Sequence, residues 1–178
     1  MQKSKTFLWN LLSVLIWIIF VSYCVQAGTL LFTVAYSYVK PEVAGKLYLD
    51  LNLSSLRENQ LEVYLSVCAG VIMLLIAKAY LFYQVIRISI QLQRVKPFSS
   101  EVAAAISSIT RNAFAVGILG IVGTGSIAEF TKQGMDFSTL AQFCDDSTGY
   151  LAMSAVMFVI DQIFKRGVEL QTENDLTV

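Results

Sequence analysis

Residues 7–39 of the chain read FLWNLLSVLIWIIFVSYCVQAGTLLFTVAYSYV and contain no charged side chain. A helix needs roughly 20 mainly apolar residues to cross a bilayer, and this run exceeds that length. Lys3 and Lys5 precede the run, as basic residues do in a secretory signal, but a cleavable signal has a much shorter apolar core. We therefore expect a retained membrane-spanning helix at about residues 7–35.

Three further apolar runs predict membrane-spanning helices at about residues 61–86, 112–130 and 148–164, of which the last is the shortest. The composition agrees, because 56% of the 178 residues are hydrophobic and 15% are charged. Soluble domains contain about 45–50% apolar and about 25% charged residues. The predicted fold is all-α: a single integral membrane four-helix bundle over residues 1–178.

Lysine and arginine predict the orientation, because they accumulate in the cytoplasmic loops of membrane proteins. Four spans place both termini on one side, and that side carries Lys3, Lys5, Arg87, Arg94, Lys96, Arg111, Lys165 and Arg166. The opposite side carries Lys40, Lys46, Arg57 and Lys132. The basic residues are twice as numerous on the first side, so the N-terminus and the C-terminus are both predicted to be cytoplasmic.

Residues 40–60 are predicted to form an outer loop between the first two spans. Apolar residues alternate with polar ones in its second half, at Leu47, Leu49, Leu51 and Leu53. This period of two indicates a short extended segment, which either packs on the helix ends or binds a partner. Ser55 and Glu58 then fit a capping box, so the second helix is predicted to begin at Ser55, before the membrane.

Residues 87–111 are predicted to form a cytoplasmic helical hairpin that extends the second and third helices. Pro97 ends the first arm, and Ser99 or Ser100 caps the second. An apolar stripe at helical spacing continues along the second arm, at Val102, Ile106, Ile109 and Ala113. The hairpin is either an ordinary tight connection or a docking site for a cytoplasmic partner.

Small residues recur along the third span, at Ala113, Ala115, Gly117, Gly120 and Gly123. Small residues allow membrane helices to approach closely. The expected use is packing inside the bundle, and a homodimer face is the alternative.

Ionisable side chains within the spans form a candidate charge cluster of Lys78, Arg111 and Asp161. Charges inside a membrane are costly, and each raises a functional hypothesis. We expect Lys78 to pair with Asp161, because neither has an opposite charge deep in its own helix. The alternatives are that Lys78 and Arg111 extend to the membrane surface, or that Asp161 pairs with Lys165 one turn on. The cluster is then either a structural clamp or an ion, proton or ligand site.

Nothing in the sequence predicts catalysis. Histidine is absent, and Cys24, Cys68 and Cys144 are too scattered to predict a metal site or a disulfide framework. We expect no catalytic residue, no metal and no cofactor. The formal net charge is zero, so direct binding to nucleic acid is not expected either.

Two short motifs carry a family resemblance. They are the KPFSSE elbow at Lys96–Glu101 and the C-terminal stretch FKRGVELQ at Phe164–Gln171, which is followed by ENDLTV at Glu173–Val178. With the four-helix layout, they resemble a bacterial membrane protein family catalogued as domain of unknown function 2975. The resemblance implies a bacterial cytoplasmic membrane and no established activity. Members are often encoded beside a small helix-turn-helix transcription regulator, which implies a partner of that kind.

The predicted function is therefore that of a membrane-anchored sensory or regulatory partner of a cytoplasmic protein. Its predicted partner surface lies on the hairpin and on the cytoplasmic tail 165–178, at Pro97, Phe98, Glu169, Leu170, Glu173 and Asp175. The alternative is a small transporter, channel or immunity-type protein that uses the intramembrane charges. A homo-oligomer is compatible with either function.

Overall fold

A computed structural model of the chain describes residues 2–45, 47, 53–91, 99–132 and 138–175. The elements are α1 (Gln2–Ser37), the short 3-10 helix η1 (Pro41–Gly45), α2 (Ser54–Asn59), α3 (Leu61–Gln91), α4 (Ser100–Lys132), α5 (Ser138–Ala141) and α6 (Ser147–Asp175). No strand occurs among these residues. Four of the helices are long and apolar enough to cross a membrane, over Phe7–Ser37, Leu61–Ile90, Ser100–Lys132 and Ser147–Glu173. The protein is thus an all-helical, multi-pass membrane protein, and each predicted span lies within one of these helices.

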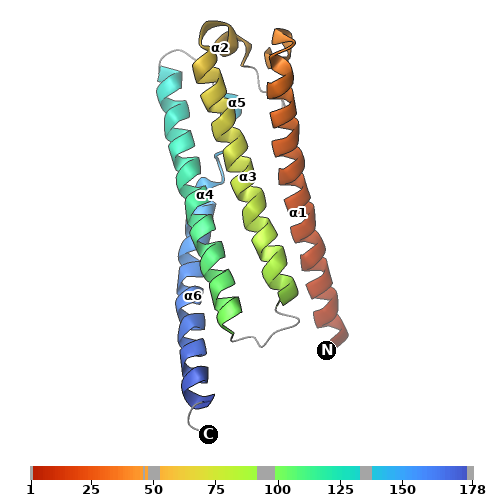
Figure 1. Ribbon diagram of the computed structural model, residues 1–178, viewed down its shortest axis with the longest axis vertical. Coiled ribbons are helices and arrows are strands. Elements are labelled where there is room, and N and C mark those ends of the chain that lie inside the picture. The colour runs from red at the N-terminus through yellow and green to blue at the C-terminus, as the bar shows by residue number, and fades with distance from the viewer. Residues whose placement is uncertain (1, 46, 48–52, 92–98, 133–137, 176–178) are drawn as a thin grey trace.

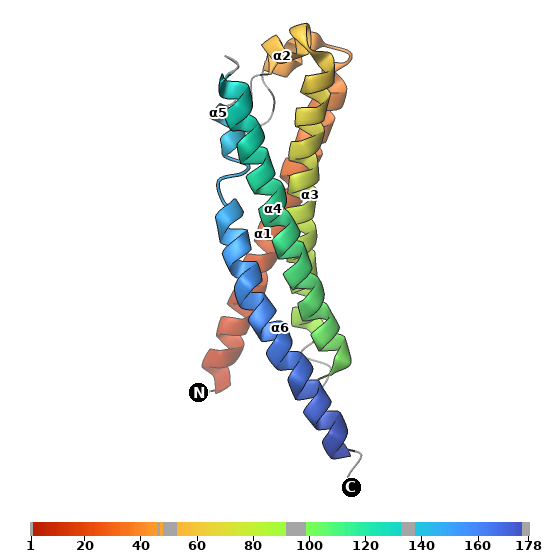
Figure 2. The same ribbon diagram turned by 90° about the vertical axis from the view of Figure 1, so that its left-hand side faces the viewer.

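The long helices follow one another around an open bundle (Figure 1). α1 packs on α3, α3 packs on α4, and α4 packs on α6. α1 and α6 diverge toward the end of the bundle that carries both chain termini (Figure 2). We call this the terminal end, and the opposite end, with η1 and α2, the far end. The cytoplasmic location of the terminal end stays a prediction.

α4 carries the apolar stripe that the spacing of its residues predicted, and this stripe packs in the interior. Its members are all buried: Val102, Ile106, Ile109 and Ala113. Ile109 and Ala113 form a cluster with Leu81 of α3. Beside this cluster, the Gln84 amide donates to the Ser108 hydroxyl at 2.8 Å and accepts from the Asn112 amide at 2.7 Å. Polar side chains that bond across helices satisfy each other where water is absent.

The start of α4 confirms one of the two expected caps. The Ser99 hydroxyl accepts from the backbone N–H of Val102 at 3.4 Å, and the Ser99 carbonyl accepts from that of Ala103 at 3.0 Å. Ser99, and not Ser100, is therefore the residue that caps the helix. Pro97 and the rest of residues 92–98 lie outside the described residues, so the tip of the predicted hairpin is not placed.

At the far end, the prediction that the second helix begins at Ser55 is wrong. α2 is a separate short helix with Leu53 at its N-cap position and no side-chain cap, and Gln60 divides it from α3. The reason lies in packing, because this turn places Leu53 and Leu56 in the core at 1% and 5% exposure. Of the alternating leucine segment, residues 48–52 are outside the described residues. Leu47 and Leu53 are both buried, as expected for packing on the helix ends.

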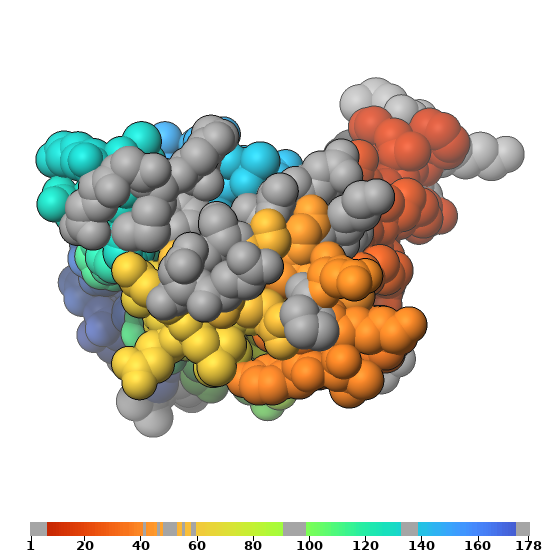
Figure 3. Space-filling view, turned by 90° about the horizontal axis from the view of Figure 1, so that it is seen from above, coloured from red at the N-terminus to blue at the C-terminus, as the bar shows by residue number. Residues whose placement is uncertain are grey.

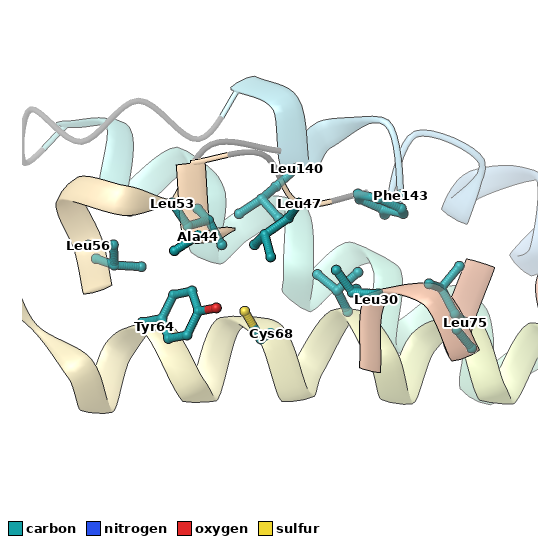
Figure 4. Packing of buried hydrophobic residues seen from close by; sticks show 12 residues of the cluster. Leu30, Ala44, Leu47, Leu53, Leu56, Tyr64, Cys68, Leu75, Leu140 and Phe143 are labelled. Carbon is teal, nitrogen blue, oxygen red and sulfur yellow. The ribbon is translucent and has the colours of Figure 1, made fainter. Parts of the chain in front are cut away.

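The largest buried cluster also lies toward the far end, between α1, α2, α3 and the segment that precedes α6. Figure 4 shows Leu30 of α1 and Leu75 of α3 beside Leu140 and Phe143. Leu140 and Phe143 are each 3% exposed, although their segment follows α4 and was expected to lie outside the membrane. This segment positions the candidate site.

Candidate functional site

α6 begins near the middle of α4, because the third span offers it a groove of glycines. A Cβ atom added at Gly120 would lie 1.8 Å from the Ser147 hydroxyl oxygen, and one at Gly117 would lie 2.6 Å from the Leu151 side chain. At 1.5 Å per residue, Gly120 is about 18 Å from the Lys132 end of α4. The expected packing of small residues inside the bundle is confirmed for Ala113, Gly117, Gly120 and Gly123, whereas Ala115 is exposed. The face that a homodimer would need is occupied by the chain's own α6.

Between α4 and α6, the chain turns back into the bundle. We call residues 138–146 the re-entrant segment; it comprises α5 and the turn after it. The turn is closed by backbone bonds from Phe143 to Leu140 at 3.1 Å and from Cys144 to Ala141 at 2.8 Å. Figure 2 shows the chain descending from α5 along α4 to the start of α6. The segment thereby carries Asp146 to the level of Lys78, near the middle of α3.

Lys78 is fully engaged by the re-entrant segment. Its ammonium group donates to the two carboxylate oxygens of Asp146, at 2.7 and 2.9 Å, and to the Phe143 carbonyl at 2.8 Å. An ammonium has three protons, so these bonds use all of them. It also lies 5.8 Å from the ring centre of Tyr23 and 5.5 Å from that of Tyr150. The Lys78 side chain is 4% exposed, whereas that of Asp146 is 45% exposed.

The predicted pair of Lys78 with Asp161 is therefore wrong. Asp146 immediately precedes α6 and Asp161 lies within it, about 22 Å further along at 1.5 Å per residue, and Lys78 bonds to Asp146. Asp146 falls between the predicted third and fourth spans, 112–130 and 148–164, so the sequence does not place it beside Lys78. Only the descent of the re-entrant segment brings its carboxylate into the bundle.

Asp161 and Arg111 belong to a second group, nearer the terminal end. Asp161 accepts from Lys165 at 2.7 Å and from the Ser107 hydroxyl of α4. Arg111 is close enough for its charge to act on Asp161. The alternative that Asp161 pairs with Lys165 is thus confirmed. This group ties α6 to α4, and Lys78 is not part of it.

A pocket of about 260 Å³ opens beside the Lys78 to Asp146 pair. Its lining comes from α1, α3 and the re-entrant segment: Tyr23, Gln26, Leu75, Lys78, Gln142, Phe143 and Asp146. The hydroxyls of Tyr23 and Tyr150 lie 3.3 Å apart and connect α1 to α6 at its edge. Of these lining residues, only Lys78 belongs to the charge cluster predicted from the sequence. A signal was present in Asp145 and Asp146, two acids placed immediately before an apolar run.

Cys144 lies in the re-entrant segment, next to the glycine groove. Burial raises the pKa of its thiol, while the charge of Lys78 acts in the opposite direction. A thiol with a raised pKa reacts slowly at neutral pH. Among the described residues, no three histidine, cysteine, aspartate or glutamate side chains gather into a metal-binding group.

The predicted partner surface is placed in part. Glu169, Leu170 and Glu173 are all exposed on α6, which extends past the ends of α3 and α4 (Figure 1). Arg166 donates to Glu169 at 2.9 Å on the same surface. Asp175 ends the helix, and its side chain is not described. Pro97 and Phe98 are outside the described residues.

A family model for a protein of unknown function (DUF2975) matches residues 39–178, which is most of the chain. The chain belongs to this family. The matched part of the DUF2975 protein includes Lys78, Asp146 and Asp161, whereas Tyr23 and Gln26 lie on α1, before the match. No curated protein and no solved structure matches the chain.

Proposed function

We propose that this DUF2975 protein is a membrane-anchored regulatory partner of a cytoplasmic protein, such as a small helix-turn-helix regulator. It resides in a bacterial cytoplasmic membrane with its terminal end in the cytoplasm. It contacts its partner through the α6 extension, which we define as residues 165–175. The projection of this extension past the ends of α3 and α4 is the observation that carries the proposal (Figure 2).

The α6 extension begins with Lys165 and Arg166, which pair with Asp161 and Glu169, and its later charged side chains are all acidic, which suits contact with a basic protein. Glu169 and Glu173 lie one helical turn apart and are exposed, with Leu170 between them at 53% exposure. An apolar side chain among acids offers both contact area and charge complementarity, and complementary charge accelerates and orients association. DNA-binding proteins carry basic surfaces, so a regulator of that type fits this extension.

The extension is also continuous with the membrane domain. α6 runs without interruption from Ser147, in the glycine groove, to Asp175. The bonds of Asp161 to Ser107 and Lys165 fix its middle to α4. A rearrangement of the re-entrant segment would therefore reach the extension by tilting one continuous helix about its attachment to α4, which is the coupling that a sensor requires.

Transport is the weaker candidate function. The Lys78 ammonium donates all three of its protons to groups of the protein, and the Asp161 carboxylate accepts from a lysine and a serine. Charges that are satisfied by fixed partners support a structural role more than an ion pathway.

The test is crosslinking in native membranes, with capture of the intact chain and of a chain truncated after Arg166. We expect the intact chain to capture a DNA-binding protein, identified by mass spectrometry, that binds again when both purified proteins are mixed. Truncation, or Glu169→Lys with Glu173→Lys, should abolish the capture. Glu129→Lys is the matched control, because Glu129 is an exposed acid at the far end of α4. Capture that survives truncation would overturn the proposal.

A further inference from the structure

Among the described residues that line it, the pocket beside Lys78 offers hydrogen-bond acceptors and no free cationic donor. The Lys78 ammonium is 4% exposed and has no proton left to donate, so it cannot serve an incoming ligand. Each carboxylate oxygen of Asp146 accepts one bond from Lys78 and retains a second acceptor position. The Asp146 side chain is 45% exposed and lines the pocket.

The remaining lining adds acceptors and an aromatic wall. The Gln26 amide nitrogen donates to the Ser22 hydroxyl at 3.2 Å, and the Gln142 amide nitrogen donates to the Thr139 carbonyl at 2.7 Å. Both glutamines line the pocket, and their amide oxygens are able to accept hydrogen bonds. The rings of Tyr23 and Phe143 supply the wall, and Tyr23 already lies beside one ammonium group, that of Lys78. Carboxylates and aromatic rings are the groups that bind organic cations.

We propose that this pocket binds a compact primary ammonium group. The ligand's N–H groups would donate to Asp146 and to the Gln26 amide oxygen, and its carbon atoms would contact Tyr23 and Phe143. A volume of about 260 Å³ admits a small amine. Asp146 would then bridge two cations, with Lys78 behind it and the ligand in front. This proposal concerns binding alone and does not depend on the cytoplasmic partner.

The source of the amine follows from depth. At 1.5 Å per residue, Lys78 lies about 25 Å from the Leu61 end of α3 and about 20 Å from the Gln91 end, so it is well away from lipid headgroups at either end. A free amine is therefore favoured over an aminophospholipid. Figure 3, a view from the far end, shows light-blue atoms of the chain after α4 between the turquoise atoms of α4 and the orange to red atoms of α1.

The experiment titrates ethylammonium chloride into the purified full-length protein, in a detergent free of aminolipids, and follows thermal stability and heat of binding. Sodium chloride and sodium acetate are titrated in parallel. We expect saturable stabilisation by ethylammonium alone. Asp146→Asn should weaken binding at least about tenfold, since a hydrogen bond to a charged group contributes that much. Glu129→Gln, at the far end of α4, should leave binding unchanged.

Gln26→Leu provides a second variant that leaves the Lys78 to Asp146 pair intact, and it should weaken binding even if Asp146→Asn fails to fold. The absence of saturable binding, equal binding of acetate, or full affinity in Gln26→Leu would overturn the proposal. A last arm repeats the assay in bilayers with and without phosphatidylethanolamine. Stabilisation by that lipid, with no effect of ethylammonium, would overturn the free amine as the source and assign the ammonium group to a headgroup.

Discussion

Gly120→Ala is the substitution that tests how α6 is seated. The added Cβ would lie 1.8 Å from the Ser147 hydroxyl oxygen and 2.7 Å from the Ser147 Cβ, while the Ser147 Cα would be 3.6 Å away. The last distance is an ordinary contact, whereas the first two require Ser147 to move. Ser147 is 4% exposed, so its side chain has little room to rotate away.

The expected cost is about 1–3 kcal/mol, the usual range for one methyl group too many in a packed interior. Alanine is favoured over glycine inside a helix by about 1 kcal/mol, so the cost must be measured against a glycine with free space. Gly125 is that control, because nothing lies within 4 Å of a Cβ added there. We expect Gly120→Ala to be less stable than Gly125→Ala by about 1–3 kcal/mol, or roughly 2–4 °C in Tm for each kcal/mol in a chain of this size.

The assay is thermal unfolding in mild detergent, completed by a double-mutant cycle with Ser147→Gly. Ser147→Gly removes both atoms that clash, so Gly120→Ala should cost little in that background. If Gly120→Ala is as stable as Gly125→Ala, or if Ser147→Gly gives no relief, then α6 does not rest in the glycine groove and this account of the site is refuted.

Lys78→Met should lower the free energy of unfolding by about 3 kcal/mol, the low end for breaking a buried ion pair, because the partner Asp146 is 45% exposed. Chemical unfolding measures this loss, and a value below about 1 kcal/mol would contradict a lysine whose three protons are all bonded. Asp161→Asn should cost about 1–2 kcal/mol through the weakened bonds to Ser107 and Lys165. Asp145→Asn changes the exposed acid next to Asp146, and it should leave the free energy of unfolding almost unchanged in the same assay. Cys144, made the single cysteine, should react with maleimide more slowly at pH 7 in the folded protein than after denaturation in SDS, because burial raises the pKa of its thiol. Raising the pH should increase the folded-state rate, and equal rates in the two states at pH 7 would show that the thiol is not buried.

The long helices could be predicted from sequence because a membrane span leaves a strong local signal. Apolar runs such as residues 7–35 and 112–130 fall within α1 and α4, and the stripe from Val102 to Ala113 is buried as its spacing indicated. Each of these features depends on residues close together in the chain. Hydropathy and helical spacing record such features directly.

The pairing of charges could not be predicted in the same way. Lys78 and Asp146 are far apart in sequence, and their contact depends on how deeply the re-entrant segment descends, which hydropathy does not report. The start of the second helix could not be predicted for a similar reason. The capping pattern at Ser55 is local, whereas the position of α2 depends on the burial of Leu53 and Leu56. A clue to the descent did exist. Gly117, Gly120 and Gly123 mark one face of α4, and that face is where the segment and α6 are seated.

The position of Asp146 at the start of α6 has a consequence for biogenesis. α6 has the lowest mean hydropathy of the four spans, 1.3 against 2.1, 2.2 and 1.7 for the others; Asp146 immediately precedes it, and Asp161 lies within it. Such a segment partitions poorly into lipid by itself. During translation, however, it emerges last, when Lys78 and the glycine face of α4 are already in the membrane. The order of synthesis therefore provides an ion-pair partner and a groove before the helix that depends on them leaves the ribosome.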